Sequence, residues 1–188
     1  MLIDTHCHLD AAEFDADRNL VAEQALQRGL GAIVLPAVAR DNFDGVIDVC
    51  ARHKNCAYAL GIHPMYVESS SLEDLEVLEQ YVGTYQPVAI GEIGLDYFLT
   101  NPRSNPDNIA RQTTFFVAQL KIARQYRLPV ILHVRNAIDD VLKQLRKYQV
   151  VGGIAHAFNG SFQQAQQFID LGFKLGFGGA MTYHRALK

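Results

Sequence analysis

Short apolar runs alternate along the chain with longer segments in which apolar residues recur at helical spacing. Runs rich in β-branched and other apolar residues predict seven strands, at positions 2–7, 32–38, 56–62, 88–93, 129–134, 151–156 and 173–178. Helix signals stand between them, including capping boxes at 71–74 and 161–164 and a long helical pattern over 107–126. This alternation predicts right-handed βαβ units, and therefore a mainly parallel sheet covered by helices.

Polar residues at the strand ends distinguish an open sheet from a barrel, which the apolar pattern alone does not. A doubly wound nucleotide-binding sheet would carry a G-x-G-x-x-G turn after its first strand, and none follows positions 2–7. Instead, histidine, glutamate and arginine stand at the C-terminal ends of several predicted strands. In a barrel all these ends open on one face. We therefore predict an α/β fold of the TIM-type (β/α) barrel class, in a single domain over residues 1–188.

The composition limits the class of protein and the compartment that we expect for this chain. With 188 residues, 49% hydrophobic and 20% charged, the chain matches one ordinary soluble domain. No apolar run approaches the ~18 residues of a membrane span, and no secretory signal opens the chain, so we expect a cytoplasmic protein without a membrane partner or an obligate protein partner. The three cysteines form no C-x-x-C pair, which favours reduced thiols. The net charge of -3 offers no basic field for a polyanion, so nucleic-acid binding would need local arginines or metal ions.

Five residues at predicted strand ends indicate a metal site. His6 and His8 stand two apart after the first strand, and a period of two points both imidazoles to one side. Glu92 lies in an apolar run between glycines, where an unpaired carboxylate would be costly. The fifth and sixth strands end in His133 and His156. Each residue alone has an ordinary explanation, as a core histidine or a salt-bridged glutamate, but five at one end of a sheet are typical of metal ligands.

The ligand types and their number limit the chemistry. Imidazole and carboxylate donors together suit zinc, manganese, iron or nickel, with magnesium a weaker fit. Five ligands exceed the needs of one structural zinc, and a carboxylate can bridge, so we expect two divalent ions roughly 3.5 to 4 Å apart around Glu92. Two such ions lower the pKa of a bound water and hold an attacked phosphoryl or carbonyl group. The residues therefore predict a hydrolase.

Five blocks of sequence also carry a family resemblance that spans the chain. They stand at 4–10 (DTHCHLD), 61–64 (GIHP), 91–97 (GEIGLDY), 128–135 (LPVILHVR) and 156–160 (HAFNG). In this order they resemble the signature blocks of the TatD family of deoxyribonucleases. One mild departure is Asn159, where serine or threonine is more usual.

The resemblance implies a TIM-barrel hydrolase with two divalent ions. It places His6 and His8 on one ion and His133 and His156 on the other, with Glu92 bridging. It also implies a divalent-dependent DNase of the 3′ to 5′ exonuclease type. A complete barrel takes roughly 250 residues, and the family's eighth strand carries an aspartate that completes the first ion site. This sequence stops after its seventh predicted strand, so we expect a C-terminally incomplete barrel without that residue.

Further polar residues are candidates for contacts with substrate. His63, next to a proline, is expected either to contact a phosphate or to be a neutral loop histidine. Arg135 shares the parity of His133, which makes it the best phosphate-binding candidate, with a carboxylate-paired structural role as the alternative. Residues 183–185 (YHR) also stand where barrels commonly bind phosphate, unless they are frayed terminal residues. The breaker-rich loop at 99–106 is expected on the surface, over the site.

The leading prediction is a divalent-metal-dependent hydrolase that cleaves phosphodiester bonds in DNA or nucleotide ends, with Glu92, His63 and Arg135 as its catalytic residues. The first alternative is an amidohydrolase-type deacylase acting on an amide, ester or aminoacyl bond, because the same site attacks a carbonyl equally well. The second alternative is a non-catalytic, truncated barrel remnant that binds metal or a partner through an open edge.

Overall fold

Seven strands form one parallel sheet whose order follows the chain. The computed structural model describes residues 2–98 and 105–182. The loop at 99–104 and Tyr183, His184 and Arg185, for which we predicted roles, lie outside these residues. Within the described chain the strands are β1 (Leu2–Asp4), β2 (Leu30–Pro36), β3 (Cys56–Leu60), β4 (Ala89–Asp96), β5 (Val130–Arg135), β6 (Gly153–Ala155) and β7 (Phe173–Leu175). Each strand pairs in parallel with the next.

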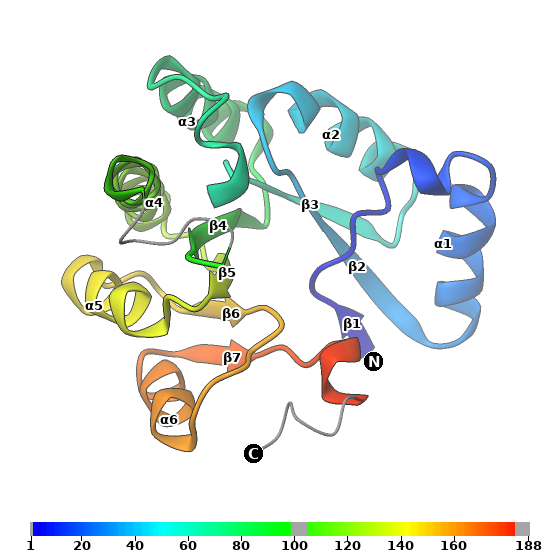
Figure 1. Ribbon diagram of the computed structural model, residues 1–188. Coiled ribbons are helices and arrows are strands. Elements are labelled where there is room, and N and C mark those ends of the chain that lie inside the picture. The colour runs from blue at the N-terminus through cyan, green and yellow to red at the C-terminus, as the bar shows by residue number, and fades with distance from the viewer. Residues whose placement is uncertain (1, 99–104, 183–188) are drawn as a thin grey trace.

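An α-helix follows each of the first six strands. Figure 1 shows these helices on the outer side of a curved sheet, with β1 and β7 at its two ends. They are α1 (Arg18–Gln27), α2 (Phe43–Arg52), α3 (Glu73–Tyr85), α4 (Pro106–Tyr126), α5 (Ile138–Tyr148) and α6 (Phe162–Asp170). Four short 3-10 helices accompany them within the described residues: η1 (Ala12–Phe14), η2 (Arg40–Asn42), η3 (Pro64–Tyr66) and η4 (Gly179–Thr182). A doubly wound sheet reverses its strand order at a switch point, whereas this order never reverses. The predicted TIM-type barrel class is confirmed.

Local signals in the sequence explain several element boundaries. At α6 both halves of the predicted capping box are present, because Ser161 N–H donates to Gln164 Oε1 at 3.0 Å and Gln164 N–H donates to Ser161 Oγ at 3.2 Å. At α3 the carboxylate half is present, where Ser71 N–H donates to Asp74 Oδ2 at 2.8 Å. The strands β1, β6 and β7 are each three residues long, shorter than predicted.

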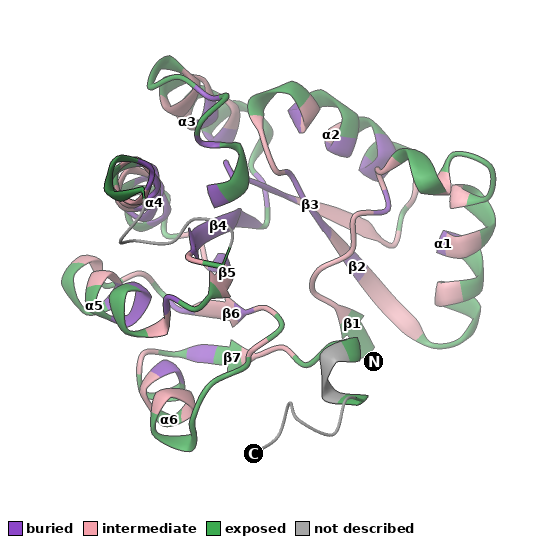
Figure 2. Ribbon diagram, in the orientation of Figure 1, coloured by how far each residue is buried: buried purple, intermediate pink, exposed green. Residues whose placement is uncertain are grey.

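The core is densest at the middle of the sheet and thinnest at its first strand. All eight residues of β4 are buried, and α4 covers this strand with the buried side chains of Phe115, Phe116 and Leu120. In β1, Leu2 is 70% exposed and Ile3 is 50% exposed. Figure 2 shows this contrast as purple β4 against green and pink β1. No helix in the described part of the chain is long and apolar enough to cross a membrane.

The three cysteines are free thiols, as predicted. Cys50 is buried, and Cys7 and Cys56 are partly buried. Burial raises the pKa of Cys50 to about 12 and that of Cys56 to about 11. These two thiols are therefore protonated near neutral pH.

Candidate metal centre

Glu92 lies at the centre of the candidate site, with a side chain only 3% exposed. Its Oε2 atom lies 2.7 Å from Nε2 of His6 and 3.7 Å from Nε2 of His8. Its Oε1 atom lies 3.1 Å from Nδ1 of His133 and 3.7 Å from Nε2 of His63. The two oxygens of one buried carboxylate thus face two different pairs of histidines.

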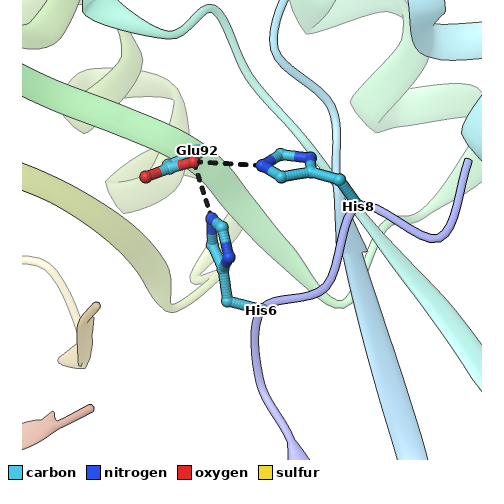
Figure 3. A group of neighbouring side chains, drawn as sticks. All are labelled: His6, His8 and Glu92. Atoms are coloured by element: carbon cyan, nitrogen blue, oxygen red, sulfur yellow. Dashed lines mark hydrogen bonds and ion pairs between the residues drawn. The ribbon is translucent and has the colours of Figure 1, made fainter. Parts of the chain in front are cut away.

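His6 and His8 come from the segment that follows β1. The chain leaves the strand after Asp4, and His6 N–H then donates to Asp4 Oδ1 at 3.1 Å. Between the two histidines, Cys7 N–H donates to Val34 O on β2 at 3.0 Å, which keeps the segment against the sheet. Figure 3 shows both imidazoles pointing at Glu92. The expected convergence of the two rings is present, although the strand ends earlier than predicted.

Glycines allow the strands around Glu92 to approach closely. Gly94 has a φ of +150°, and a Cβ there would lie 1.9 Å from the backbone oxygen of His133. A Cβ on Gly61, after β3, would lie 2.8 Å from the carbonyl carbon of Gly91. Neither position tolerates a side chain without moving backbone. These glycines therefore permit the close approach of the strands around Glu92.

A second carboxylate, Asp96 at the end of β4, contacts the other nitrogen of His133. Asp96 Oδ2 lies 2.9 Å from His133 Nε2, and the Asp96 side chain is 2% exposed. A metal-binding histidine typically donates its second N–H to a carboxylate, which fixes the tautomer. With a cation bound, His133 would donate from Nε2 to Asp96 and offer Nδ1 to the cation. Without a cation, Nδ1 lies 3.1 Å from Glu92 Oε1 and can donate to it. Our predicted site omitted Asp96, although a position four residues after Glu92 lies on the same side of a strand.

His63 is held in one tautomer by the turn that follows it. Its Nδ1 accepts a hydrogen bond from Met65 N–H at 3.1 Å, so this nitrogen carries no proton. Burial lowers the pKa of His63 to about 4, and the ring is neutral near pH 7. The ring proton then sits on Nε2, the atom that faces Glu92. His63 is therefore better suited to donate a hydrogen bond into the site than to bind a cation there.

The charges of the central groups depend on one another. Burial by itself would raise the pKa of Glu92, but hydrogen bonds from His133 and His6 hold that pKa well below its usual range. Burial would lower the pKa of His133, whereas its contacts with Glu92 and Asp96 raise it. The contact with Glu92 also raises the pKa of His8. Glu92 is thus a buried anion surrounded by groups that stabilise negative charge.

The two remaining predicted residues lie around this centre. His156 follows β6 and stacks on His6, with ring centroids 3.6 Å apart and planes 12° apart. Burial lowers the pKa of His156 to about 4, so its ring is a neutral nitrogen donor near pH 7. Arg135 ends β5 in an exposed position, and its guanidinium carbon lies 3.5 Å from the centroid of the Phe98 ring. The structure brings His156 to the cluster and directs Arg135 toward Phe98.

The donor atoms fall into two groups that share Glu92. His6, His8 and Glu92 offer three ligand atoms within 4.8 Å of one another, and so do His63, Glu92 and His133. Imidazole nitrogens and carboxylate oxygens are common ligands of zinc and other divalent transition metals. The donor set therefore fits one divalent cation beside His6 and His8 and another beside His133, where His63 in its present tautomer offers a hydrogen bond rather than a ligand atom.

Comparisons with known proteins find a family model and curated relatives that match this chain. The family model "TatD related DNase" matches residues 3–188. The chain is 40% identical over 189 residues to YjjV of Escherichia coli strain K12, described as an uncharacterized metal-dependent hydrolase, covering 99% of this chain and 71% of the relative. It is 33% identical over 190 residues to YabD of Bacillus subtilis strain 168, which has the same description, covering 100% of this chain and 72% of the relative.

The fold agrees with this sequence similarity. The crystal structure of YjjV, a TatD homolog from E. coli K12, superposes with a TM-score of 0.90 at 39% sequence identity. The match covers 98% of this chain and 71% of the other.

Proposed function

Because this chain belongs to the TatD-related DNase family of metal-dependent hydrolases, we propose that it cleaves phosphodiester bonds in DNA with two divalent ions. The reaction is of the 3′ to 5′ exonuclease type that the family resemblance implies. Residues on the two sides of Glu92 would hold these ions, which would be magnesium, manganese or zinc.

The division of the Glu92 oxygens carries this proposal. One oxygen faces His6 and His8, and the other faces His133 and His63. A buried carboxylate with histidines on both sides is suited to bridge two cations. The contact between Asp96 and His133 supports the same assignment, because it directs the Nδ1 atom of His133 toward Glu92.

In this proposal each residue of the cluster has a stated role. His6, His8 and Glu92 would hold one ion, and Glu92, His133 and His156 would hold the other. His156 remains a predicted ligand, because its ring stacks on His6. When bound, the ions lower the pKa of a water molecule and polarise the group under attack.

The chain supplies substrate contacts of its own. The Nε2–H of His63 faces the site and is suited to donate a hydrogen bond to a phosphate oxygen. Arg135 lies over Phe98, which is 56% exposed. An exposed aromatic ring beside a guanidinium offers a base a stacking surface and a phosphate a cation, the two features common in sites for single-stranded DNA. This pair favours DNA over an aminoacyl or amide substrate.

The test is hydrolysis by the purified, metal-stripped chain after Mn²⁺ or Mg²⁺ is restored. Single-stranded DNA labelled at its 5′ end should shorten progressively, whereas DNA labelled at its 3′ end should lose its label as a mononucleotide at once. An aminoacyl ester and an N-acyl amide are assayed in parallel. Chelation should abolish the release of nucleotides.

Two outcomes contradict the proposal. Hydrolysis of the ester or amide without cleavage of DNA would instead support the deacylase alternative. Metal binding without turnover of any substrate would support a non-catalytic role. His53→Ala is the control variant and should cleave DNA as the unmodified chain does. His53 precedes β3 and lies at the opposite end of the sheet from His63.

A further inference from the structure

Two buried glutamines on α4 contact the backbone at the ends of the site-bearing strands. Gln112 is 2% exposed and Gln119 is 0% exposed. They are seven residues apart, so they lie about two turns apart on one face of the helix. Glutamine is mostly exposed in proteins, and a buried carboxamide needs partners for all its polar atoms. The residues that these two side chains bind adjoin the candidate metal centre.

Gln119 binds both backbone groups of Ile62. Ile62 N–H donates to Gln119 Oε1 at 2.6 Å, and Gln119 Nε2 donates to Ile62 O at 3.0 Å. The same Nε2 also donates to Phe115 O at 3.2 Å, so both of its hydrogens are used. Ile62 lies beyond the end of β3 and directly precedes His63. The carboxamide therefore fixes the backbone from which the His63 ring extends.

Gln112 makes the same pair of bonds to Asp96. Asp96 N–H donates to Gln112 Oε1 at 2.9 Å, and Gln112 Nε2 donates to Asp96 O at 3.1 Å. Its remaining hydrogen bonds to Asn108 Oδ1 at 2.7 Å. Since the carboxylate of Asp96 lies 2.9 Å from His133 Nε2, a fixed Asp96 backbone also fixes the partner that orients the His133 ring.

We infer that Gln119 and Gln112 are positioning residues for the metal centre. Gln119 sets the His63 ring, and Gln112 sets Asp96 and, through it, His133. The inference rests on the proposed function, in which His133 holds an ion and His63 contacts substrate. Each glutamine acts on a different histidine, which a general contribution to core stability would not do.

The experiment replaces each glutamine with methionine, which is similar in length and makes no such hydrogen bonds. The control is Gln125→Met on the same helix, where Gln125 Nε2 donates to Glu79 Oε1 on the exposed surface at 2.7 Å. Two properties are measured in the full chain. The first is the ¹⁵N spectrum of the histidine rings in metal-free protein, assigned with single histidine variants, and the second is the affinity for Mn²⁺ by calorimetry.

The two variants should give different results. In Gln119→Met the His63 signals should shift, because the backbone that precedes the ring is no longer held, while the His133 signals stay in place and the Mn²⁺ affinity stays within about twofold. In Gln112→Met the His133 signals should shift and the Mn²⁺ affinity should fall about tenfold, the low end for loss of a partner outside the ligand shell. Gln125→Met should change neither property.

Other outcomes overturn the inference or the proposed function separately. If both variants shift both histidines alike, in proportion to the fall in Tm, the glutamines serve only the core and the inference is wrong. If the unmodified chain binds no divalent ion, the proposed function fails, yet the ring ¹⁵N spectra of the metal-free variants still decide the inference. Should a methionine variant fail to fold, Gln119→Asn and Gln112→Asn keep an uncharged carboxamide on a side chain too short to hold the same backbone contacts, and they give the same two readouts.

Discussion

The centre of the sheet and its first edge hold their candidate ligands in different ways. Glu92 belongs to β4, which is buried along its whole length and covered by α4. His6 and His8 follow β1, a strand of three residues in which Leu2 is 70% exposed. The side chain of His8 is itself 37% exposed, against 3% for Glu92.

The hydrogen bonds that anchor the two regions differ in the same way, because they are buried at the centre and only part-buried at the edge. At the centre, buried carboxamides from α4 bind the backbone of Ile62, beside His63, and of Asp96, whose carboxylate contacts His133. At the edge, Arg18 donates to the backbone oxygens of Leu9 and Asp10, just beyond His8. Low local stability is expected where few buried contacts hold a segment. The candidate ligands at the centre are therefore held in place by the fold, whereas we expect the position of those at the edge to depend more on a bound ion.

The largest expected effect is the loss of the carboxylate that the two regions share. Glu92→Gln replaces one ligand oxygen with an N–H donor and removes the negative charge. Affinity for both ions should fall by more than about 1,000-fold, since loss of an outer partner alone costs roughly 10- to 100-fold. Calorimetry with Mn²⁺ and elemental analysis after dialysis measure this effect.

The matched control is Glu79→Gln, which makes the same change on the exposed surface of α3. It should bind Mn²⁺ as the unmodified chain does. Unchanged stoichiometry in Glu92→Gln would show that the edge and the centre do not share a bridging ligand.

The next prediction, of intermediate size, compares the two regions without any metal by the free energy of unfolding that each loses when a leucine is shortened. Leu95 in β4 is 1% exposed, whereas Leu2 in β1 is 70% exposed. Leu95→Ala should lower the free energy of unfolding by roughly 2 to 5 kcal/mol, because it leaves a cavity in the core. Leu2→Ala should lower it by less than about 0.5 kcal/mol. Urea unfolding followed by circular dichroism measures both, and equal losses would contradict the comparison.

The sequence predicted the fold class and the central cluster because both rest on short-range patterns. Alternation of apolar runs and helices identified the seven strands, and polar residues at their C-terminal ends indicated a common face. His6 and His8 were expected to point the same way from a period of two, and both rings do face Glu92. The lengths of β1, β6 and β7 were overestimated. Val151 and Phe177 are apolar and were predicted in strands, but they are 62% and 58% exposed and lie outside the ladder.

The supporting residues could not be predicted in the same way. A glutamine on a helix is ordinarily exposed, so Gln112 and Gln119 give no local sign of burial, and only the packing of α4 on β4 reveals their partners. The tautomer of His63 likewise depends on a backbone N–H two residues later, in a turn whose geometry the sequence does not specify. Only Asp96 had a usable signal, its shared parity with Glu92.

The smallest expected effect is the increase in local stability that bound ions give to segment 2–8 at the first edge. Opening of the segment 2–8 should release His6 and His8 from an ion, whereas opening of β7 (Phe173–Leu175) releases no predicted ligand. At a Mn²⁺ concentration of ten times Kd, the free energy of any opening that expels the ion rises by about 1.4 kcal/mol. Amide hydrogen exchange in segment 2–8 should therefore slow by about tenfold, and exchange in β7 should stay unchanged.

The comparison of the two edge strands makes this measurement decisive, because β1 and β7 are equally short and each pairs with one strand among the described residues. Amides of β4 that exchange only on global unfolding should slow at least as much as those of segment 2–8, since global unfolding expels both proposed ions. Equal slowing of β7 would mean that the ions stabilise the chain as a whole. Slowing confined to segment 2–8 and β4 would mean that bound ions join the first edge to the centre of the sheet through Glu92.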